Sequence, residues 1–512
     1  MRILGAILAA FLLAVLPLES LGSADSCPRA IPVPPAARLS RRIWNAGDPL
    51  AARFLPALRG GGEPKPAKDG ESGTLAQLLV ARDVDAVYAA IATAKGELDA
   101  ECLSIAMHRI AKNAMSKTQP GPEFQGNLEL RKKTRADPRF QPLLEKIETA
   151  LSKHGKKFTS RSMAMLAWAL AKMSLHDAVT PSLRTLEKEV HRRGKNGLLG
   201  EWLPQELAMV AWAYGTERWH STTIAADLQT EVLARQTDSA KGGPKLEKFK
   251  AQELKDLVWG ATRMGASVGP LYKAVSEAVI LRKLTMFKAQ ETANLVWGIA
   301  HSKVEKGEEE EKSVYLAALL EETEREVSRR GAGKYDPMQL SQVLDACVAA
   351  RRFSSHLFPI FEALAMAPRP TSPKARITQK EGAINLSRFR PQELKDFLRS
   401  FAVAKKGSEA FWGLAADLVI NGGPEMGKEV GSRLTNMHEV EFVGIVEAFS
   451  LAGRLSGATL NALSAEILRR DLSTFEVGSL ASLLFHVEPH YEAKEATKAL
   501  KAAGAGGKPG GG

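Results

Sequence analysis

A short phrase that recurs along the chain constrains its fold more than any other feature. Phe249–Ala261 reads Phe-Lys-Ala-Gln-Glu-Leu-Lys-Asp-Leu-Val-Trp-Gly-Ala, and 38 residues later Phe287–Ile299 reads Phe-Lys-Ala-Gln-Glu-Thr-Ala-Asn-Leu-Val-Trp-Gly-Ile. Self-similarity at a nearly regular spacing is the sequence signature of repeat architectures. Copies of the phrase, strong or weak, begin 38 to 60 residues apart at Leu98, Phe158, Trp202, Phe249, Phe287, Tyr335, Phe389, Met437 and Phe475.

Each copy has the pattern of a helix start. Proline at the third position of several copies suits the first helical turn, where its missing N–H costs nothing, and the Gln-Glu pair that follows places an acid where the helix dipole favours it. Small residues beside the tryptophan, such as Gly260 and Gly298, predict that neighbouring helices approach closely. In the copy at 249, apolar residues at i, i+3, i+4 and i+7 predict one buried stripe: Leu254, Leu257, Val258 and Ala261.

A second amphipathic helix follows in each unit and tends to end in a basic pair. The clearest examples are 182–193, 271–283, 313–330 and 459–470. A helix pair of this kind cannot bury its apolar faces alone, so successive pairs must stack. The sequence therefore predicts an all-α fold, an α-solenoid of stacked helix-turn-helix repeats with about nine units of roughly 38 to 50 residues.

The regions outside the repeats predict a targeted protein. Residues 1–24 have the charged, apolar and small-residue segments of a signal peptide. Residues 25–62 are rich in Arg, Pro and Ala and resemble a transit peptide. Together they predict delivery to a plastid through the secretory pathway; mitochondrial import, secretion or a signal anchor are the alternatives. Residues 63–97 are predicted to be a linker and first helices, 98–490 the repeat array, and 491–512 a flexible Gly-rich tail.

Charge and chemistry favour binding over catalysis. The 512-residue chain has a formal net charge of +12, which favours a polyanionic partner. Its three cysteines are far apart, and we find no metal-ligand spacing, P-loop, dinucleotide-binding turn or nucleophile elbow. We therefore predict no enzyme activity, no cofactor, no metal, no small-molecule substrate and no stable membrane span once the leader is cleaved.

The phrase Phe-x-x-Gln-Glu-Leu-Ala-x-x-x-Trp-Ala/Gly, in a unit of about 38 residues, resembles the octotricopeptide repeat. Proteins with this repeat, and the related RAP-domain proteins, serve organelle gene expression. The resemblance extends over about 98–490 and implies binding of single-stranded organellar RNA, in transcript processing, stability or translation, beside other RNA-processing proteins. The chain departs from these relatives in two respects: no RAP-like segment follows Phe485, and the Pro-Pro-Pro-Glu-Tyr-Trp signature of the algal family is not legible.

Two sets of residues are candidate RNA contacts, since helical-repeat readers combine a basic groove with one base-contacting module per unit. Cations at the ends of the first helices are candidates for phosphate contact, with capping of the helix dipole as the alternative: Lys112, Lys172, Arg218, Arg263, Lys303, Arg351, Arg352, Lys405, Lys406 and Arg454. Variable mid-helix residues are candidates for base contact, with an ordinary solvated face as the alternative: Lys255, Asp256, Asn294, Gln342, Lys395 and Asp396.

The tryptophans of the phrase favour packing over base stacking, because aromatic residues that recur beside a core stripe usually lie in the core. The alternative function is a scaffold of the HEAT or armadillo type that binds proteins and not RNA. A basic groove and salt-sensitive RNA binding would favour the first function, and an apolar groove the second.

Overall fold

The computed structural model describes residues 71–115, 123–174, 180–237, 246–367, 385–422 and 433–490, together with Ile7. Ile7 apart, the predicted signal peptide (1–24), leader (25–62) and tail (491–512) lie outside these ranges. Within them the regular structure is helical, and the only β-type pairing is an isolated bridge between Ser267 and Lys303. The predicted all-α class is confirmed.

Each of the nine predicted repeat starts is followed, two residues later, by the first residue of a helix. We call these the first helices. They are α5 (Ala100–Ala114), α8 (Ser160–Met173), α10 (Pro204–Thr216), α12 (Ala251–Met264), α14 (Ala289–Ala300), α16 (Pro337–Ala349), α19 (Pro391–Val403), α21 (Glu439–Leu451) and the helix over 477–490.

A second helix follows the first in the eight repeats before the last: α7 (Phe140–His154), α9 (Thr180–Lys195), α11 (Thr222–Thr237), α13 (Gly269–Arg282), α15 (Glu309–Arg330), α17 (Leu357–Ala365), α20 (Glu409–Asn421) and α22 (Gly457–Arg469). Two short helices, α3 (Glu71–Val80) and α4 (Val84–Ala92), precede the array. One more helix, α6 (Glu123–Ala136), lies between the first and second helices of the first repeat. This extra helix accounts for the 60-residue interval between the starts at 98 and 158.

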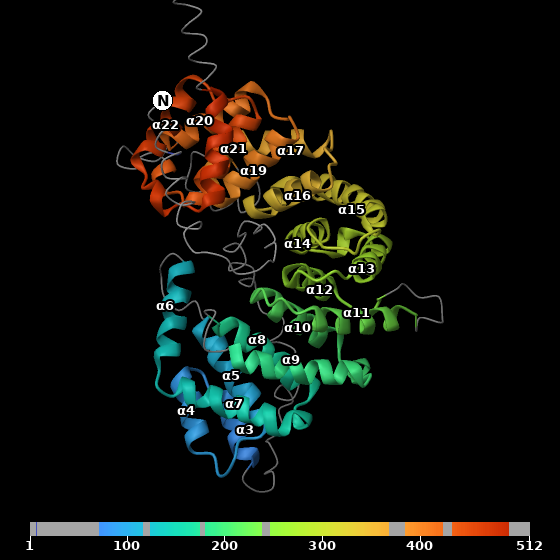
Figure 1. The fold of residues 1–512 in the computed structure, drawn as a ribbon. Coiled ribbons are helices and arrows are strands. Elements are labelled where there is room, and N and C mark those ends of the chain that lie inside the picture. Colours follow the sequence, from blue (N-terminus) through green and yellow to red (C-terminus); the bar gives the residue numbers. More distant parts are fainter. Residues whose placement is uncertain are drawn as a thin grey trace, which may run out of the picture. The chain divides into compact units, whose positions relative to one another are not determined.

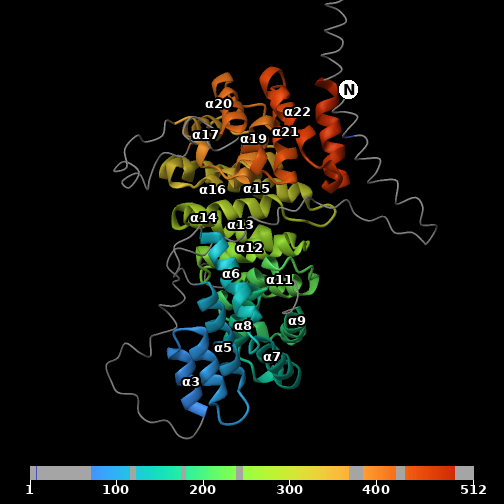
Figure 2. The ribbon, with the colours of Figure 1, turned by 90° about the vertical axis from the view of Figure 1, so that its left-hand side faces the viewer.

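The chain divides into two compact units between Leu319 and Leu320, inside α15. In the first unit, α5, α8, α10, α12 and α14 pack side by side in chain order, and α7, α9, α11 and α13 form a second row (Figures 1 and 2). In the second unit, α16, α19 and α21 pack in the same way, and α20 contacts α22. Helices that each contact the next along the chain are the packing of an α-solenoid, as predicted.

The recurring glutamate of the phrase caps its own helix. Glu206, Glu253, Glu291, Glu393 and Glu441 each accept a hydrogen bond from the backbone N–H three residues earlier, at 2.8–2.9 Å. This contact satisfies one of the donors that a helix start leaves unpaired.

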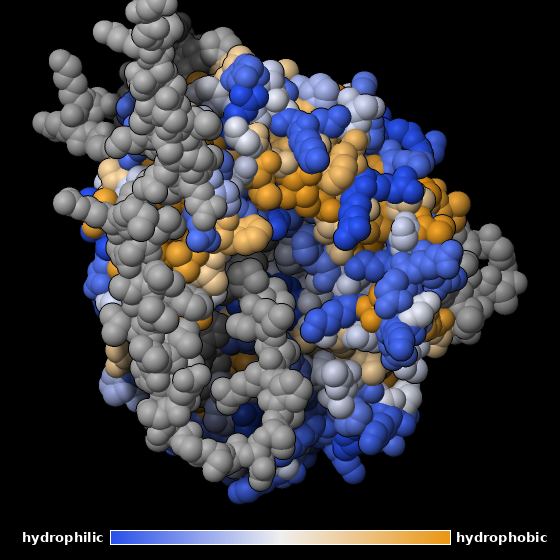
Figure 3. All heavy atoms as spheres, turned by 45° about the horizontal axis from the view of Figure 1, so that its top comes forward, coloured by the Kyte–Doolittle hydropathy of each residue, from blue (hydrophilic) through white to orange (hydrophobic). Residues whose placement is uncertain are grey.

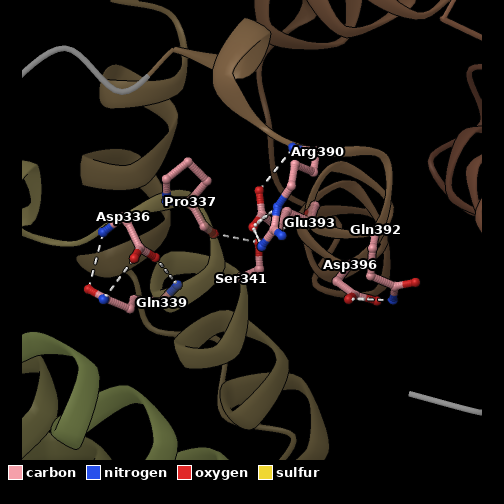
Figure 4. Close-up of polar contacts among 8 residues, drawn as sticks. All are labelled: Asp336, Pro337, Gln339, Ser341, Arg390, Gln392, Glu393 and Asp396. Atoms are coloured by element: carbon pink, nitrogen blue, oxygen red, sulfur yellow. Dashed lines mark hydrogen bonds and ion pairs between the residues drawn. The ribbon is translucent and has the colours of Figure 1, made fainter. Parts of the chain in front are cut away.

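Figure 4 shows two such starts on neighbouring helices, Glu393 with Arg390 in α19 and the reciprocal pair Asp336 and Gln339 in α16. Between them the Ser341 hydroxyl donates to the carbonyl oxygen of Glu393, 3.1 Å away. The start of one first helix is thereby tied to the body of the preceding one.

Arginines at the ends of four second helices connect the two helices of a repeat. Arg193, Arg235, Arg282 and Arg470 donate to the carbonyl oxygens of Phe158, Trp202, Phe249 and Met437, at 2.6–2.9 Å. Each bond joins the end of a second helix to the start of the first helix of the same repeat. The basic pairs noted in the sequence are therefore partly structural. Short 3-10 turns, which the sequence did not predict, precede every start from Phe158 onward except Phe249, at 155–157, 198–201, 284–286, 332–334, 386–388, 433–436 and 472–474.

We expect this connection to be sensitive to acid. Glu189, Glu326 and Glu466 hold the terminal arginines by ion pairs of 2.5–2.9 Å. Burial acts to raise their pKa values, but hydrogen bonds from the arginines outweigh it and leave each pKa below the usual 4.5. Their stabilisation is therefore complete above pH 4.5 and is lost as the pH falls through the lowered values. In urea unfolding, Glu466→Gln should be less stable than the wild type at neutral pH, and the difference should close in strong acid. A difference independent of pH would contradict this.

The first helices α10 and α12 approach so closely that only glycine fits between them. A Cβ at Gly260 would overlap the backbone carbonyl of Ala211, and a Cβ at Gly215 would lie 2.6 Å from the Cα of Gly260. The predicted close approach of the helices is confirmed here.

Gly260→Ala should lower the free energy of unfolding by about 1–3 kcal/mol, because the backbones must separate, although alanine is favoured over glycine in a helix by about 1 kcal/mol. The matched control is Gly413→Ala in α20, where a Cβ would meet nothing within 4 Å. The control should gain about 1 kcal/mol in thermal unfolding. A gain at both positions would show that α10 and α12 are not in contact here.

Candidate nucleic-acid interface

Five first helices end in the same backbone turn. The residue 16 positions after the repeat start has a left-handed φ, and the N–H that follows it bonds to the carbonyl five residues before. In the second unit these bonds run from Arg352 to Cys347 (2.8 Å), from Lys406 to Phe401 (2.9 Å) and from Arg454 to Phe449 (2.8 Å). This is the Schellman turn, in which the left-handed residue is usually glycine.

A cation stands in three of these five turns where glycine is favoured. Gly265 (φ 71°) and Gly453 (φ 67°) follow the rule, whereas Arg218 (51°), Arg351 (51°) and Lys405 (52°) do not. A left-handed φ costs a residue with a Cβ about 1–2 kcal/mol. The turn itself does not need these side chains, and strain of this kind is concentrated at functional sites.

The packing of the first helices brings the predicted cations together at one end of each unit's stack. We call this row of residues the basic edge. Neighbouring packed helices are about 8–10 Å apart, so the cations follow one another at steps of that order. In the first unit the basic edge consists of Lys112, Lys172, Arg218, Arg263 and Lys303, and in the second of Arg351, Arg352, Lys405, Lys406 and Arg454.

The cations of the basic edge differ in exposure and in their partners. Lys303, Arg351, Arg352, Lys405 and Lys406 are exposed, and the other five are half-buried. Arg352 lies 3.8 Å from a carboxylate oxygen of Glu321, and Arg454 lies 2.5 Å from one of Glu409. These two charges are partly compensated within the protein.

The tryptophans of the phrase are mostly buried between repeats, as the packing interpretation predicted. Trp168, Trp212 and Trp259 are 7%, 5% and 5% exposed, whereas Trp297 is half-buried. The rings of Trp212 and Trp259 stack with their centroids 6.4 Å apart, and the ammonium of Lys172 lies 4.4 Å from the centroid of Trp212. Lys172 of the basic edge thus lies over the face of a tryptophan ring.

His108 takes the tryptophan position in the first repeat and lies 5.1 Å from the ring of Trp168. Burial, helped by the positive charge of Lys112 and neighbouring arginines, lowers the pKa of His108 to about 4. The imidazole is therefore neutral at pH 7, as a packed residue should be.

The mid-helix candidates do not lie on an ordinary solvated face, so that alternative is wrong for them. Lys255, Asp256 and Asn294 are buried, and Gln342, Lys395 and Asp396 are half-buried. Lys255 pairs with Asp256, while the Lys395 ammonium lies 2.7 Å from a carboxylate oxygen of Asp396. Burial raises the pKa values of both aspartates, against the opposing effect of the neighbouring lysines.

Two of these mid-helix side chains have polar atoms without a partner. The Oδ1 of Asn294 and the Oε1 of Gln342 are buried and accept no hydrogen bond from the residues that the structure describes. A buried acceptor without a donor costs about 1–3 kcal/mol. Base contact by these residues stays a prediction.

The sequence missed His220 as a member of the first unit's interface. A Cβ at Gly265 would lie 3.4 Å from the Nδ1 of His220 and 3.7 Å from the Nζ of Lys303. The loops that follow α10 and α14 therefore converge at Gly265, which follows α12. A lone histidine in a loop between repeats carries no periodic signal by which it could have been found.

Other kinds of site find no support in the part of the chain that the structure describes. No group of three or more His, Cys, Asp and Glu residues there is arranged to hold a metal ion, and no helix there is both long and apolar enough to cross a membrane. Cys102 and Cys347 are buried. Among known proteins, no family model matches the chain and no curated protein matches it.

Proposed function

We propose that this protein binds single-stranded organellar RNA along the basic edge and acts in transcript processing, stability or translation. One observation carries the proposal: consecutive first helices end on the same side of the stack, and at three of these ends a cation occupies a strained position that suits glycine. The resemblance of the repeat to the octotricopeptide repeat implies the same function. Residues 1–62 imply the location, a plastid reached through the secretory pathway.

The physical case rests on the chemistry of single strands. Their phosphates attract a row of cations, and the release of condensed counterions drives binding. A solenoid presents such a row at a regular step, so that one repeat meets one nucleotide. The unpartnered oxygens of Asn294 and Gln342 would accept hydrogen bonds from base amino groups if the helices part slightly on binding.

A protein-binding scaffold is the second candidate, and one observation favours it. Phe485, in the tryptophan position of the last repeat, is 74% exposed, and Leu451 is 43% exposed. The helices that carry them are in contact, because the Ser450 hydroxyl donates to the carbonyl of His486 at 3.2 Å. The face in Figure 3 likewise has hydrophobic residues, in orange, grouped between hydrophilic ones.

The test is a binding titration of the full chain with mixed-sequence single-stranded RNA at several salt concentrations. For single strands, the logarithm of the association constant should fall with the logarithm of the salt concentration by about 0.7 per phosphate contact. Steep salt dependence supports the proposal. Absence of binding at low salt would overturn it and favour the scaffold, and partners captured by the chain would then be compared with those captured by Phe485→Ser.

Replacing the strained cations by glycine should separate binding from folding. In Arg351→Gly/Lys405→Gly, glycine relieves about 1–2 kcal/mol of backbone strain at each site, which stabilises the folded chain. Glycine also makes the unfolded chain more flexible, which lowers stability by about 0.4–1 kcal/mol at each site. We therefore expect the melting temperature to be unchanged or higher, while RNA affinity falls and its salt dependence becomes shallower. Melting curves and RNA titrations of the same preparations measure both. Unchanged RNA affinity would mean that Arg351 and Lys405 do not contact RNA.

A further inference from the structure

The ends of three consecutive first helices in the first unit hold a cluster of basic groups. Arg218 follows α10, Arg263 lies in the last turn of α12, and Lys303 follows α14. The imidazole of His220 and the ammonium of Lys303 both lie against the bare Cα of Gly265, because a Cβ there would be 3.4 Å and 3.7 Å from them. The backbone bridge between Ser267 and Lys303 joins two of the turns. Figures 1 and 2 show these three helices stacked in order.

The arginines of this cluster lack a counter-charge. The Nη2 of Arg218 and the Nε of Arg263 are buried and have no hydrogen-bond partner in the described chain. The Arg263 guanidinium instead lies over the Trp259 ring, whose centroid is 5.5 Å from the guanidinium carbon. Burial, together with the charge of Arg218, lowers the pKa of Arg263 to about 10, and burial alone lowers that of Arg218. Two unneutralised guanidinium groups held near each other are costly unless an anion joins them.

Nearby carboxylates are engaged elsewhere. Glu217, next to Arg218 in the chain, accepts a hydrogen bond from the hydroxyl of Ser174 at 2.5 Å. Glu308, in the loop after α14, accepts from the backbone N–H of Glu305 at 3.1 Å. Lys312 adds another cation to this region and donates to the carbonyl of Ser302 at 2.7 Å. These carboxylates keep their charge, but their hydrogen bonds hold them to partners other than Arg218 and Arg263.

We propose that Arg218, His220, Arg263 and Lys303 form a phosphate-binding site at the ends of α10, α12 and α14. The inference rests on the proposed function and deepens it, because it assigns one backbone phosphate of the bound strand to a defined set of side chains. Guanidinium groups suit this role, since they pair with phosphate oxygens through two parallel hydrogen bonds. Gly265 matters because it leaves room for the strand backbone beside His220 and Lys303.

The experiment uses the full chain, two probes and three variants. The probes are inorganic tripolyphosphate, followed by the shift in melting temperature, and mixed-sequence single-stranded RNA, followed by titration at several salt concentrations. The variants are Arg218→Gly/Arg263→Gln, the exposed single change Lys303→Gln, and a control, Lys146→Gln/Lys153→Gln, which removes two exposed cations from α7.

We expect tripolyphosphate to raise the melting temperature of the wild type and the control but not that of the arginine variant. The slope of RNA affinity against salt should become shallower by about 0.7 in the arginine variant, for the one phosphate contact that is lost. Without any ligand, the arginine variant should melt at or above the wild-type temperature at low salt, because like charges are removed. If the arginine variant does not fold, Lys303→Gln gives the same comparison, with a smaller loss of tripolyphosphate stabilisation and of RNA affinity.

The outcomes separate this site from the proposed function. If the wild type binds RNA and the variants bind it equally with the same salt slope, the site is overturned and the proposed function stands. If RNA does not bind but tripolyphosphate stabilises the chain only when Arg218 and Arg263 are present, the site stands as a polyphosphate site and the proposed function fails. If neither probe binds, both are overturned.

Discussion

Trp259→Ala is expected to lower the free energy of unfolding by about 3–5 kcal/mol, the usual cost of truncating a buried tryptophan. The side chain is 5% exposed and stacks on Trp212 of the preceding repeat. The ring thus fills the seam between α10 and α12, where Gly260 and Ala211 bring the two backbones together. A cavity in this seam weakens the coupling between two repeats, which a solenoid cannot recover elsewhere because each repeat contacts only its neighbours.

The chain contains a matched control at the same position of another repeat. Phe485 is 74% exposed, so Phe485→Ala should change the free energy of unfolding by no more than about 0.5 kcal/mol. Urea unfolding of both variants, followed by tryptophan-independent far-UV circular dichroism, gives the comparison. A loss at Trp259 as small as that at Phe485 would mean that the ring serves a surface function and not packing.

Charge reversal at Lys405 and Lys406 should have the largest effect on RNA binding. Both side chains are exposed, and neither forms an ion pair with a residue that the structure describes. Loss of each phosphate contact costs about 1.5 kcal/mol, the lower end of the range for hydrogen bonds to charged groups. Lys405→Glu/Lys406→Glu should therefore weaken RNA binding about a hundredfold, since 1.4 kcal/mol is about tenfold in affinity.

The control for charge alone is Lys146→Glu/Lys153→Glu on the second helix α7, which changes the net charge by the same amount away from the basic edge. This control should bind RNA nearly as well as the wild type. Both variants should have melting temperatures close to that of the wild type. Equal weakening in the two variants would mean that RNA responds to net charge and not to the basic edge. Unchanged binding in Lys405→Glu/Lys406→Glu would remove the main support for RNA contact along this row.

The positions of the first helices were accessible from the sequence, because everything that defines them is local. Proline or alanine stands two residues after six of the nine starts, and this residue, the capping glutamate where present and the apolar stripe all lie within one short segment. The nine starts from Leu98 to Phe475 are therefore each followed by a helix at the same offset. The close helix approach at Gly260 was also predictable, because a small residue beside a large ring in a repeated phrase indicates close helix packing.

Three features were decided only by tertiary structure. The arginines at second-helix ends form bonds to carbonyls more than 30 residues away, such as Arg193 to Phe158, so their spacing in the sequence indicates only helix capping. Lys255 and Asp256 look like a solvated pair in the sequence but are buried, because neighbouring first helices cover them.

The third feature is the left-handed turn that carries the basic edge. Glycine at Gly265 or Gly453 would predict such a turn, but Arg218, Arg351 and Lys405 adopt it against their own preference. Local preference determined the repeat and its helices, since each is stabilised within a few turns of chain. The strain at these cations, and the placement of each one in the basic edge of its own unit, came only from packing each first helix against the next, because residues some 40 to 60 positions apart meet only in the stacked solenoid.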